Sequence, residues 1–294
     1  MKELVKYWLA LSKIPNLGTV GIKRLYEHFG SAEVIWKADK LELSKVEEIS
    51  EKTIDSILKG REELNPDEEL KSIKDIQVLT LEDSDYPENL KNIYDPPPII
   101  YLRSEIKPQD KKAIAIVGTR KPSHYGVSVA KKFATELVEL GFTIISGLAY
   151  GIDSAAHEGA LEAKGRTIAV FGSGIDIIYP PKNKRLPQSI EKSGYLVSEF
   201  PPGKKPENWM FPQRNRIISG LSLGVIVVEG YYDSGAMITA KLALEQGREV
   251  FAVPGNIEST LTKGPHWLIK QGAKLIEGID DILEELKMVM PGVE

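Results

Sequence analysis

The sequence predicts an α/β protein whose larger part is a doubly wound, mostly parallel sheet, preceded by a small all-helical domain. From Lys111 onward, six short apolar runs rich in β-branched residues alternate with segments of helical periodicity. The runs are almost continuously apolar, which indicates a sheet covered by helices on both faces. Regular alternation of strand and helix indicates right-handed crossovers between parallel strands. The expected architecture is therefore Rossmann-like.

The first 75 residues are expected to form the helical domain, because their apolar residues recur at helical spacing without strand-like alternation. Gly18 and Gly21 stand in a short link between two of these helices. This pattern resembles the helix-hairpin-helix element, in which a glycine-containing turn presents backbone N–H groups to a DNA phosphate. The alternative is an ordinary helical turn that needs glycine for its positive φ. The sequence leaves both interpretations open.

Residues 76–110 are expected to form an extended connector that packs on the following domain. A Tyr-Pro step at 86–87 and three prolines at 96–98 exclude long helices here. The expected organisation is thus a helical domain at 1–75, this connector, and an α/β domain at 111–294.

Each strand of the α/β domain is expected from one run of apolar residues. The strands are expected at 113–117, 142–146, 166–171, 194–198, 224–229 and 248–253. Helices are expected between them, at 126–140, 151–163, 183–193 and 234–246. Ligands of such sheets bind beyond the carboxyl ends of the strands, so the residues that follow each strand are the candidates for a site.

Glycine and small polar residues follow five of the six expected strands. Glycine lets a backbone approach a ligand closely, and free N–H groups at helix N-termini favour anions. One such loop is typical of any turn, but five at one sheet edge predict a shared anion-binding rim. The candidate residues of this rim are Gly118, Thr119, Arg120, Ser146, Gly147, Gly151, Asp153, Gly172, Ser173, Gly174, Ser234 and Gly235.

The loop after the first strand carries no nucleotide-cofactor motif. Neither G-x-G-x-x-G nor G-x-x-x-x-G-K-[ST] follows Val117. A G-x-G pattern begins at Gly172, but Ile177 occupies the position of the third glycine. We therefore expect no cofactor in this domain.

Arg120 follows the first strand of the sheet at the turn into a helix. A guanidinium can bind a phosphate through two parallel hydrogen bonds, a geometry that an ammonium cannot match. The alternative for Arg120 is an ion pair with a nearby carboxylate. We expect the phosphate contact.

The formal net charge of −4 hides a basic segment between Ile178 and Arg216, which holds eight Lys or Arg and three Glu. Such a segment is where a polyanion is expected to bind. Trp209 and Phe211 either stack on exposed bases or belong to the core. The candidate contacts in this segment are Lys182, Asn183, Lys184, Arg185, Arg214, Asn215 and Arg216.

Other kinds of site find little support in the composition. The chain has no cysteine, which excludes disulfides and thiolate metal sites, and four scattered histidines. His157 and Asp153 are four residues apart, but without a third ligand an ordinary structural histidine is favoured. The N-terminus has neither a signal-peptide cleavage site nor a membrane-spanning length, so a cytoplasmic protein without membrane contacts is expected.

Several segments together resemble the DNA-processing protein A family, also called Smf. They include VGTRKPSHYG, SGLAYGIDSAAHEGAL, FGSGIDIIYPPKN and the long stretch from Phe211 to Asn256. The resemblance covers residues 80–286, and the helical N-terminal region is similar to the family's SAM-like domain. It implies a homodimeric single-stranded-DNA-binding protein, not an enzyme, that protects incoming DNA in natural transformation and loads the RecA recombinase.

The resemblance also assigns individual residues. It implies that Arg120 contacts a phosphate, that Lys182, Lys184 or Arg185 binds DNA, and that Arg214 and Arg216 belong to the site, with Arg216 either in contact or structural. It places the dimer surface in the C-terminal part of the α/β domain. The sequence departs from the family pattern at 264–267, where Gly-Pro-His-Trp replaces a small-residue stretch with an asparagine. A form without the family's C-terminal winged-helix domain is expected.

Two other functions are consistent with the expected fold. A hydrolase that cleaves a phosphoribosyl bond would use Glu229 or Asp153 as acid or base and the glycine rim for phosphate, and fold alone does not exclude it. A purely structural or partner-recruiting protein would leave the basic segment without a role.

Overall fold

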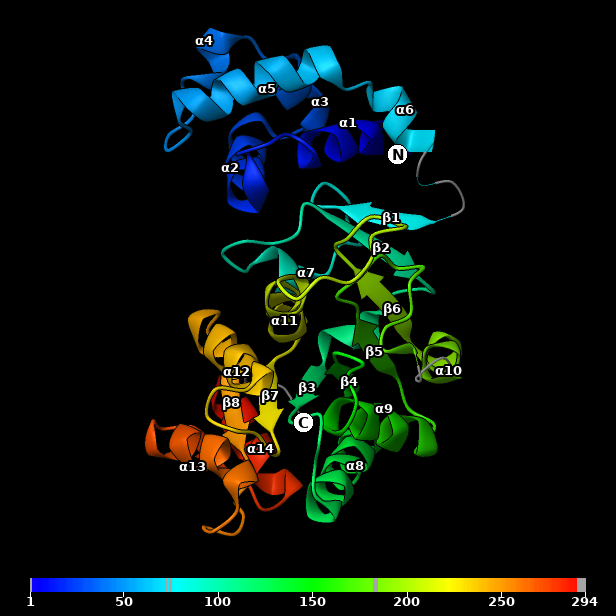
Figure 1. The fold of residues 1–294 in the computed structure, drawn as a ribbon, viewed down its shortest axis with the longest axis vertical. Helices are drawn as coiled ribbons and strands as arrows, with labels where there is room; N and C mark the ends of the chain where they lie inside the picture. Colours follow the sequence, from blue (N-terminus) through cyan, green and yellow to red (C-terminus); the bar gives the residue numbers. More distant parts are fainter. Residues whose placement is uncertain (1, 72, 74–75, 182–184, 290–294) are drawn as a thin grey trace. The chain divides into compact units, whose positions relative to one another are not determined.

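The computed structural model describes residues 2–71, 73, 76–181 and 185–289 of the chain. It divides into two compact units, Met1–Leu102 and Arg103–Glu294 (Figure 1). The expected α/β class with an N-terminal helical region is confirmed.

The helical part of the first unit consists of short helices with polar caps. The side chains of Ser31 and Ser50 each accept a hydrogen bond from a backbone N–H at the start of a helix, and Asp39 forms a capping box with Glu42. Trp8 is fully buried, its ring centre lies 5.3 Å from that of Tyr26, and its Nε1 donates a hydrogen bond to Glu82. The helices are α1 (Lys2–Ser12), α2 (Gly18–Phe29), α3 (Ala32–Lys37), α4 (Lys40–Leu43), α5 (Glu51–Glu63) and α6 (Pro66–Lys71).

The link between α1 and α2 contains two residues with positive φ, Asn16 at 64° and Gly18 at 62°. Glycine adopts this backbone conformation without steric cost, which accounts for Gly18 at the first position of α2. Gly21 lies inside α2, where an added Cβ would be 3.1 Å from Leu17 Cδ1. A contact between this link and DNA stays a prediction.

Residues 76–110, expected as an extended connector, contain regular structure. β1 (Gln77–Thr80) pairs antiparallel with β2 (Ile99–Arg103), and α7 (Glu88–Lys91) lies between them in sequence. The Tyr86 hydroxyl donates a hydrogen bond of 2.7 Å to the Pro97 carbonyl. The boundary between the units falls within β2, and the three-part division expected from the sequence stays a prediction.

The sheet of the second unit is built from parallel pairs. Their order is β6-β5-β4-β3-β7-β8-β9, so the first strand, β3, lies between β4 and β7. The six strands expected from sequence are present with small shifts at their ends. The strands are β3 (Ala113–Val117), β4 (Thr143–Ser146), β5 (Thr167–Val170), β6 (Tyr195–Ser198), β7 (Gly224–Val227), β8 (Glu249–Ala252) and β9 (Lys274–Leu275).

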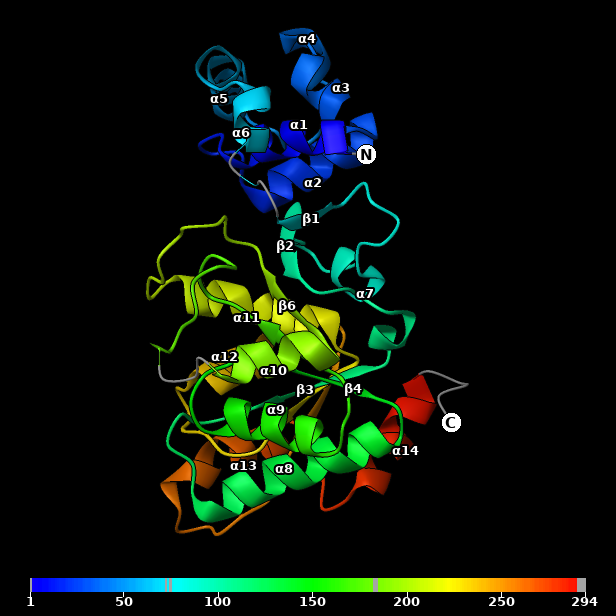
Figure 2. The same cartoon turned by 90° about the vertical axis from the view of Figure 1, so that its right-hand side faces the viewer.

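Helices cover both faces of this sheet (Figure 2). On one face α8 (His124–Glu139) packs against α9 (Ile152–Glu162), with α10 (Arg185–Ser193) beside α9. On the other face α11 (Met210–Leu221) packs against α12 (Gly235–Glu245).

Two further helices follow β8. α13 (Lys263–Lys270) connects β8 to β9, and α14 (Ile279–Val289) returns to α8. Ile282 and Leu286 of α14 join Phe133 and Leu137 of α8 in the main hydrophobic core.

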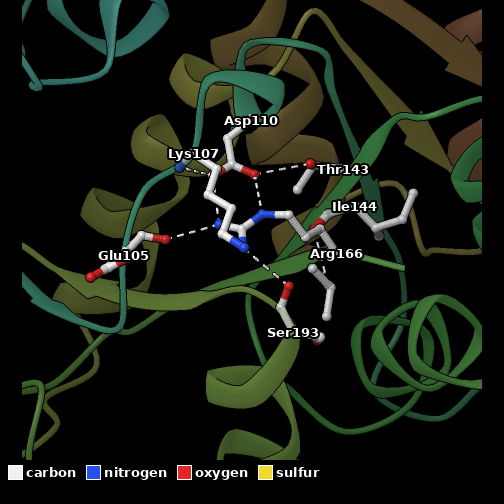
Figure 3. A network of polar contacts seen from close by, with 8 residues as sticks. Glu105, Lys107, Asp110, Thr143, Ile144, Arg166 and Ser193 are labelled. Atoms are coloured by element: carbon white, nitrogen blue, oxygen red, sulfur yellow. Dashed lines mark hydrogen bonds and ion pairs between the residues drawn. The ribbon is translucent and has the colours of Figure 1, made fainter. Parts of the chain in front are cut away.

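The amino-terminal edge of the sheet is closed by a buried ion pair between Arg166 and Asp110 (Figure 3). Two hydrogen bonds of 2.7 Å join Arg166 Nε and Nη2 to the two carboxylate oxygens. The guanidinium also donates to the carbonyls of Glu105 and Ser193, and Asp110 accepts from Thr143 Oγ1. The network thereby joins the segment before β3, the first residue of β4 and the segment before β5 at the edge opposite the expected rim.

We predict that Asp110→Ala lowers the free energy of unfolding by about 3–5 kcal/mol, because it leaves the Arg166 charge buried without its partner. Urea unfolding measures the change. Glu162→Ala removes one exposed carboxylate that pairs with Lys131 and serves as the control, with an expected loss within about 1 kcal/mol. Equal losses in the two variants would contradict this role of Asp110.

Candidate nucleic-acid interface

A cavity of about 530 Å³ opens at the carboxyl ends of β3 and β7. These neighbouring strands flank the point where the strand order reverses, which is where doubly wound sheets bind ligands. The turn after β3, one side of α11 and the start of α12 form its walls. The candidate residues that line it are Gly118, Thr119, Arg120, Asp153, Arg214, Asn215, Ser234 and Gly235.

Arg120 is exposed in this cavity, and its guanidinium lies 5.6 Å from the centre of the Phe211 ring. Within the described residues, Arg120 makes neither a hydrogen bond nor an ion pair. The contact with Phe211 places the guanidinium without using its N–H donors. The structure therefore presents a cation whose donors are available to a ligand.

Backbone hydrogen bonds hold the turn that carries Arg120. The Thr119 N–H donates to the Glu229 carbonyl (2.7 Å), and the Ile152 N–H donates to the Thr119 carbonyl (3.2 Å). Gly151 has a φ of 80° and lies against this turn, where an added Cβ would be 2.9 Å from the Arg120 carbonyl carbon. Gly151 is thus required for packing beneath the turn.

Arg214 extends from α11 into the floor of the cavity and is buried. It donates to the carbonyl of Gly147 (2.7 Å), directly after β4, and to that of Val170, the last residue of β5. An added Cβ at Gly147 would lie 2.7 Å from Arg214 Nη2 and 2.8 Å from Asp153 Oδ2, so both side chains depend on this glycine.

Arg214 and Asp153 share a buried environment. Burial lowers the pKa of Arg214 to about 10, so it stays charged near neutral pH. Burial raises the pKa of Asp153, while Arg214 and the N–H groups of Ala149 and Gly147 oppose that rise. Asp153 Oδ2 accepts a hydrogen bond of 3.3 Å from the Ala149 N–H.

Arg216, two residues further along α11, does not reach the cavity. It is buried, with 4% of its surface exposed, and pairs with Glu199 at 2.5 Å. Residues two apart on a helix point in different directions, so α11 directs Arg214 to the cavity and Arg216 away from it. The structure therefore gives Arg216 a structural position. Asn215 donates to the Gly235 carbonyl and joins α11 to the start of α12.

Other candidate residues of the rim make contacts inside the protein. Ser146 Oγ donates to the Ile116 carbonyl, and Ser173 Oγ donates to the Ile177 carbonyl. The Gly174 N–H donates to the Lys204 carbonyl. Gly172 makes room for Phe211, because an added Cβ would be 2.7 Å from Phe211 Cδ1. These residues stabilise the loops and do not line the cavity.

The candidates of the basic segment near α10 are placed only in part. Lys182, Asn183 and Lys184 lie outside the described residues. Arg185 is exposed at the first position of α10 and does not line the cavity. Their DNA contacts stay predictions.

Glu229, considered above as a catalytic acid or base, accepts hydrogen bonds at the start of a helix. It is buried, with 2% of its surface exposed, and accepts hydrogen bonds from Ser123 N–H (2.9 Å) and Ser123 Oγ (2.5 Å). Ser123 is the N-cap of α8. Glu229 therefore fixes the start of α8, where a carboxylate is stabilised by the helix dipole.

His157 is fully buried in α9. The Thr167 hydroxyl donates to the Ile144 carbonyl, so Thr167 Oγ1 accepts a hydrogen bond from His157 Nδ1 at 2.6 Å. Burial lowers the pKa of His157 to about 3, with a smaller contribution from Arg214. The described residues contain no group of three side chains placed to hold a metal ion. The same residues include no helix long and apolar enough to cross a bilayer.

Sequence reasoning missed several residues of the cavity wall. They are Lys121, Tyr179, Asn208, Tyr231 and Ile238. The ring centres of Tyr179 and Phe211 lie 5.4 Å apart, so an aromatic ring from a loop and one from α11 meet beside Arg120. Lys121 directly follows the predicted phosphate contact, so the sequence offered it as a second cation. The other residues come from separate parts of the chain that only the tertiary fold brings together: Tyr179 from the segment between β5 and α10, Asn208 and Tyr231 from the loops before α11 and α12, and Ile238 from α12.

Fold and cavity together define a Rossmann-like domain with an exposed arginine at its topological switch point and no dinucleotide motif. Residues 77–287 match the family described as DNA recombination-mediator protein A, and the chain belongs to this family.

The sequence and the fold are similar to those of several proteins of this family. Protein Smf from Synechocystis is 43% identical over 95% of this chain and 72% of its own length. The crystal structure of DprA from Streptococcus pneumoniae shares 34% identity over 97% of this chain and 98% of its own, with a TM-score of 0.84. A DprA structure from Helicobacter pylori, described in terms of its single-stranded-DNA-binding mode, shares 31% identity over 73% of this chain and 98% of its own, with a TM-score of 0.65.

We predict that Gly151→Ala is less stable than Gly141→Ala by about 1–3 kcal/mol in urea unfolding. Both glycines have a positive φ, 80° and 81°, so both variants carry backbone strain. A Cβ added at position 151 would clash with the turn that carries Arg120, whereas a Cβ added at position 141 has no atom within 4 Å. Equal stability of the two variants would show that the turn tolerates displacement.

We predict that His157 makes the protein less stable as the pH falls. Its pKa is about 3 in the folded protein and about 6.5 when unfolded, so unfolding takes up a proton between these values. Stability therefore decreases from pH 6.5 downward by up to ~1.4 kcal/mol per pH unit. In urea unfolding across this range, His157→Gln should show a shallower pH dependence than the parent protein. Parallel curves would contradict the assignment.

Proposed function

We propose that this protein binds single-stranded DNA through the cavity at the carboxyl edge of its sheet, with Arg120 as the main phosphate contact. The observation that carries the proposal is the exposed guanidinium of Arg120, held against Phe211 with its donors uncommitted among the described residues. Such a group suits bidentate binding of a phosphate. The Helicobacter pylori relative, described as binding single-stranded DNA, supports the choice of ligand.

The surroundings of Arg120 favour a nucleic-acid strand. Lys121 is exposed at the same cavity and adds a second positive charge beside it. Arg214 adds a third positive charge at the floor of the cavity, although its Nη1 donates hydrogen bonds to two backbone carbonyls. Phe211 and Tyr179 provide aromatic surface next to these cations, the combination that single-stranded nucleic-acid sites use.

Further roles follow from family membership as part of this proposal. The protein protects incoming single strands during natural transformation and delivers them to the RecA recombinase. It acts in the cytoplasm as a homodimer, with the dimer surface in the C-terminal part of the α/β domain. The family description, a recombination mediator, supports the transfer of a bound strand to a recombinase.

The remaining basic candidates extend the same proposal. Arg185 and residues 182–184 belong to the basic segment. They would contact phosphates in the part of the strand that extends beyond the cavity. Each phosphate neutralised on a single strand contributes about −0.7 to the slope of log K against log salt. The number of such contacts is therefore measurable from the salt dependence.

We predict that Arg120→Glu weakens binding of a dT oligonucleotide roughly 10- to 100-fold and makes the salt slope shallower by about 0.7. Arg120→Lys keeps the charge but loses the bidentate geometry, so its affinity should fall between those of the parent and Arg120→Glu. Fluorescence anisotropy at several salt concentrations measures both quantities.

The matched control is Lys132→Glu, which makes the same change of charge on α8 at a residue that does not line the cavity. Circular dichroism should show that all three variants remain folded. Affinity of folded Arg120→Glu equal to that of the parent protein would refute the proposed site.

A further inference from the structure

Two consecutive tyrosines beside the cavity are exposed although each is large and aromatic. Tyr231 and Tyr232 follow β7 in the loop that leads to α12, with 47% and 59% of their surface exposed. Tyr231 lines the same cavity as Arg120. Neither ring belongs to the hydrophobic core of the domain.

The loop that carries these tyrosines is fixed by backbone hydrogen bonds. The Gly230 N–H donates to the Leu261 carbonyl (2.6 Å), and the Gly264 N–H donates to the Gly230 carbonyl (3.0 Å). The Ser234 N–H donates to the Tyr231 carbonyl (3.1 Å) and closes a turn around the pair. Gly264 permits this approach, because an added Cβ would lie 2.7 Å from the Gly230 carbonyl oxygen.

Tyr232 is further held by a ring contact with Trp267 of α13. The two ring centres are 5.2 Å apart and the planes meet at 87°, an edge-to-face arrangement that leaves much of Tyr232 open to solvent. The exposed rings therefore sit on a rigid base.

We propose that Tyr231 and Tyr232 form a base-stacking platform for nucleotides next to the one whose phosphate binds Arg120. This inference rests on the proposed binding of single-stranded DNA. Exposed aromatic rings beside a cationic cavity are the feature on which successive unpaired bases stack. Residues 230–234 contain no cation and include Asp233, so this side of the cavity suits bases and not phosphates.

The test compares a dT oligonucleotide with a strand of equal length made of abasic residues. Tyr231→Ala/Tyr232→Ala should bind the dT strand roughly 5- to 100-fold more weakly than the parent protein. Its salt slope should equal that of the parent, because no phosphate contact is lost. On the abasic strand the double variant and the parent should bind equally, since no base remains to stack.

Two control variants accompany the double variant. Tyr231→Phe/Tyr232→Phe keeps both rings and should retain affinity for dT within about twofold. Tyr94→Ala removes a tyrosine that is 71% exposed in the other unit and should leave binding unchanged. Light scattering reports the oligomeric state of every variant.

The outcomes separate this inference from the function on which it rests. Parent protein that binds neither strand would refute the proposed function itself. Salt-sensitive binding that is lost in Arg120→Glu but unchanged in the double alanine variant would refute only the platform. A changed oligomeric state with unchanged affinity would likewise refute it and assign the tyrosines to contact with a second copy of the chain.

Discussion

The buried guanidinium of Arg214 is the interaction on which the candidate site depends. Parallel strands end in carbonyl groups that the sheet no longer pairs, and a buried carbonyl without a donor is costly. Arg214 supplies donors to the ends of β4 and β5 and lies against Asp153. Because Arg214 takes this internal task, the guanidinium of Arg120 above it stays uncommitted within the described residues.

The sheet was predictable from sequence because each central strand is buried on both faces and reads as a continuous apolar run. The position of Arg120 at the cavity followed from the same rule, since residues after parallel strands meet at one edge. The antiparallel pair of β1 and β2 was not predicted, because the prolines in the segment between the two strands indicate irregular structure. β9, with two residues, is too short to show any periodicity.

The different positions of Arg214 and Arg216 were beyond sequence reasoning. Both occur in one basic string, and the helix that separates their directions, α11, was not predicted because Pro212 and polar residues obscure its periodicity. The partner of Arg216 is Glu199, 17 residues earlier on another element, and only the tertiary fold brings the two together. Tyr231, in the loop before α12, and Ile238, in α12, reach the cavity for the same reason, because only the tertiary fold places α12 beside α11.

The hydrogen bonds from Thr119 and Ile152 make the binding edge stiff before any ligand arrives. A site that already has its bound shape loses little conformational entropy on association, so more of each contact contributes to affinity. Under the proposed function, encounter with a flexible strand would require ordering of the strand alone, a condition that favours a high association rate. The backbone beneath Arg120 would then influence the rate of association with a strand as well as the affinity.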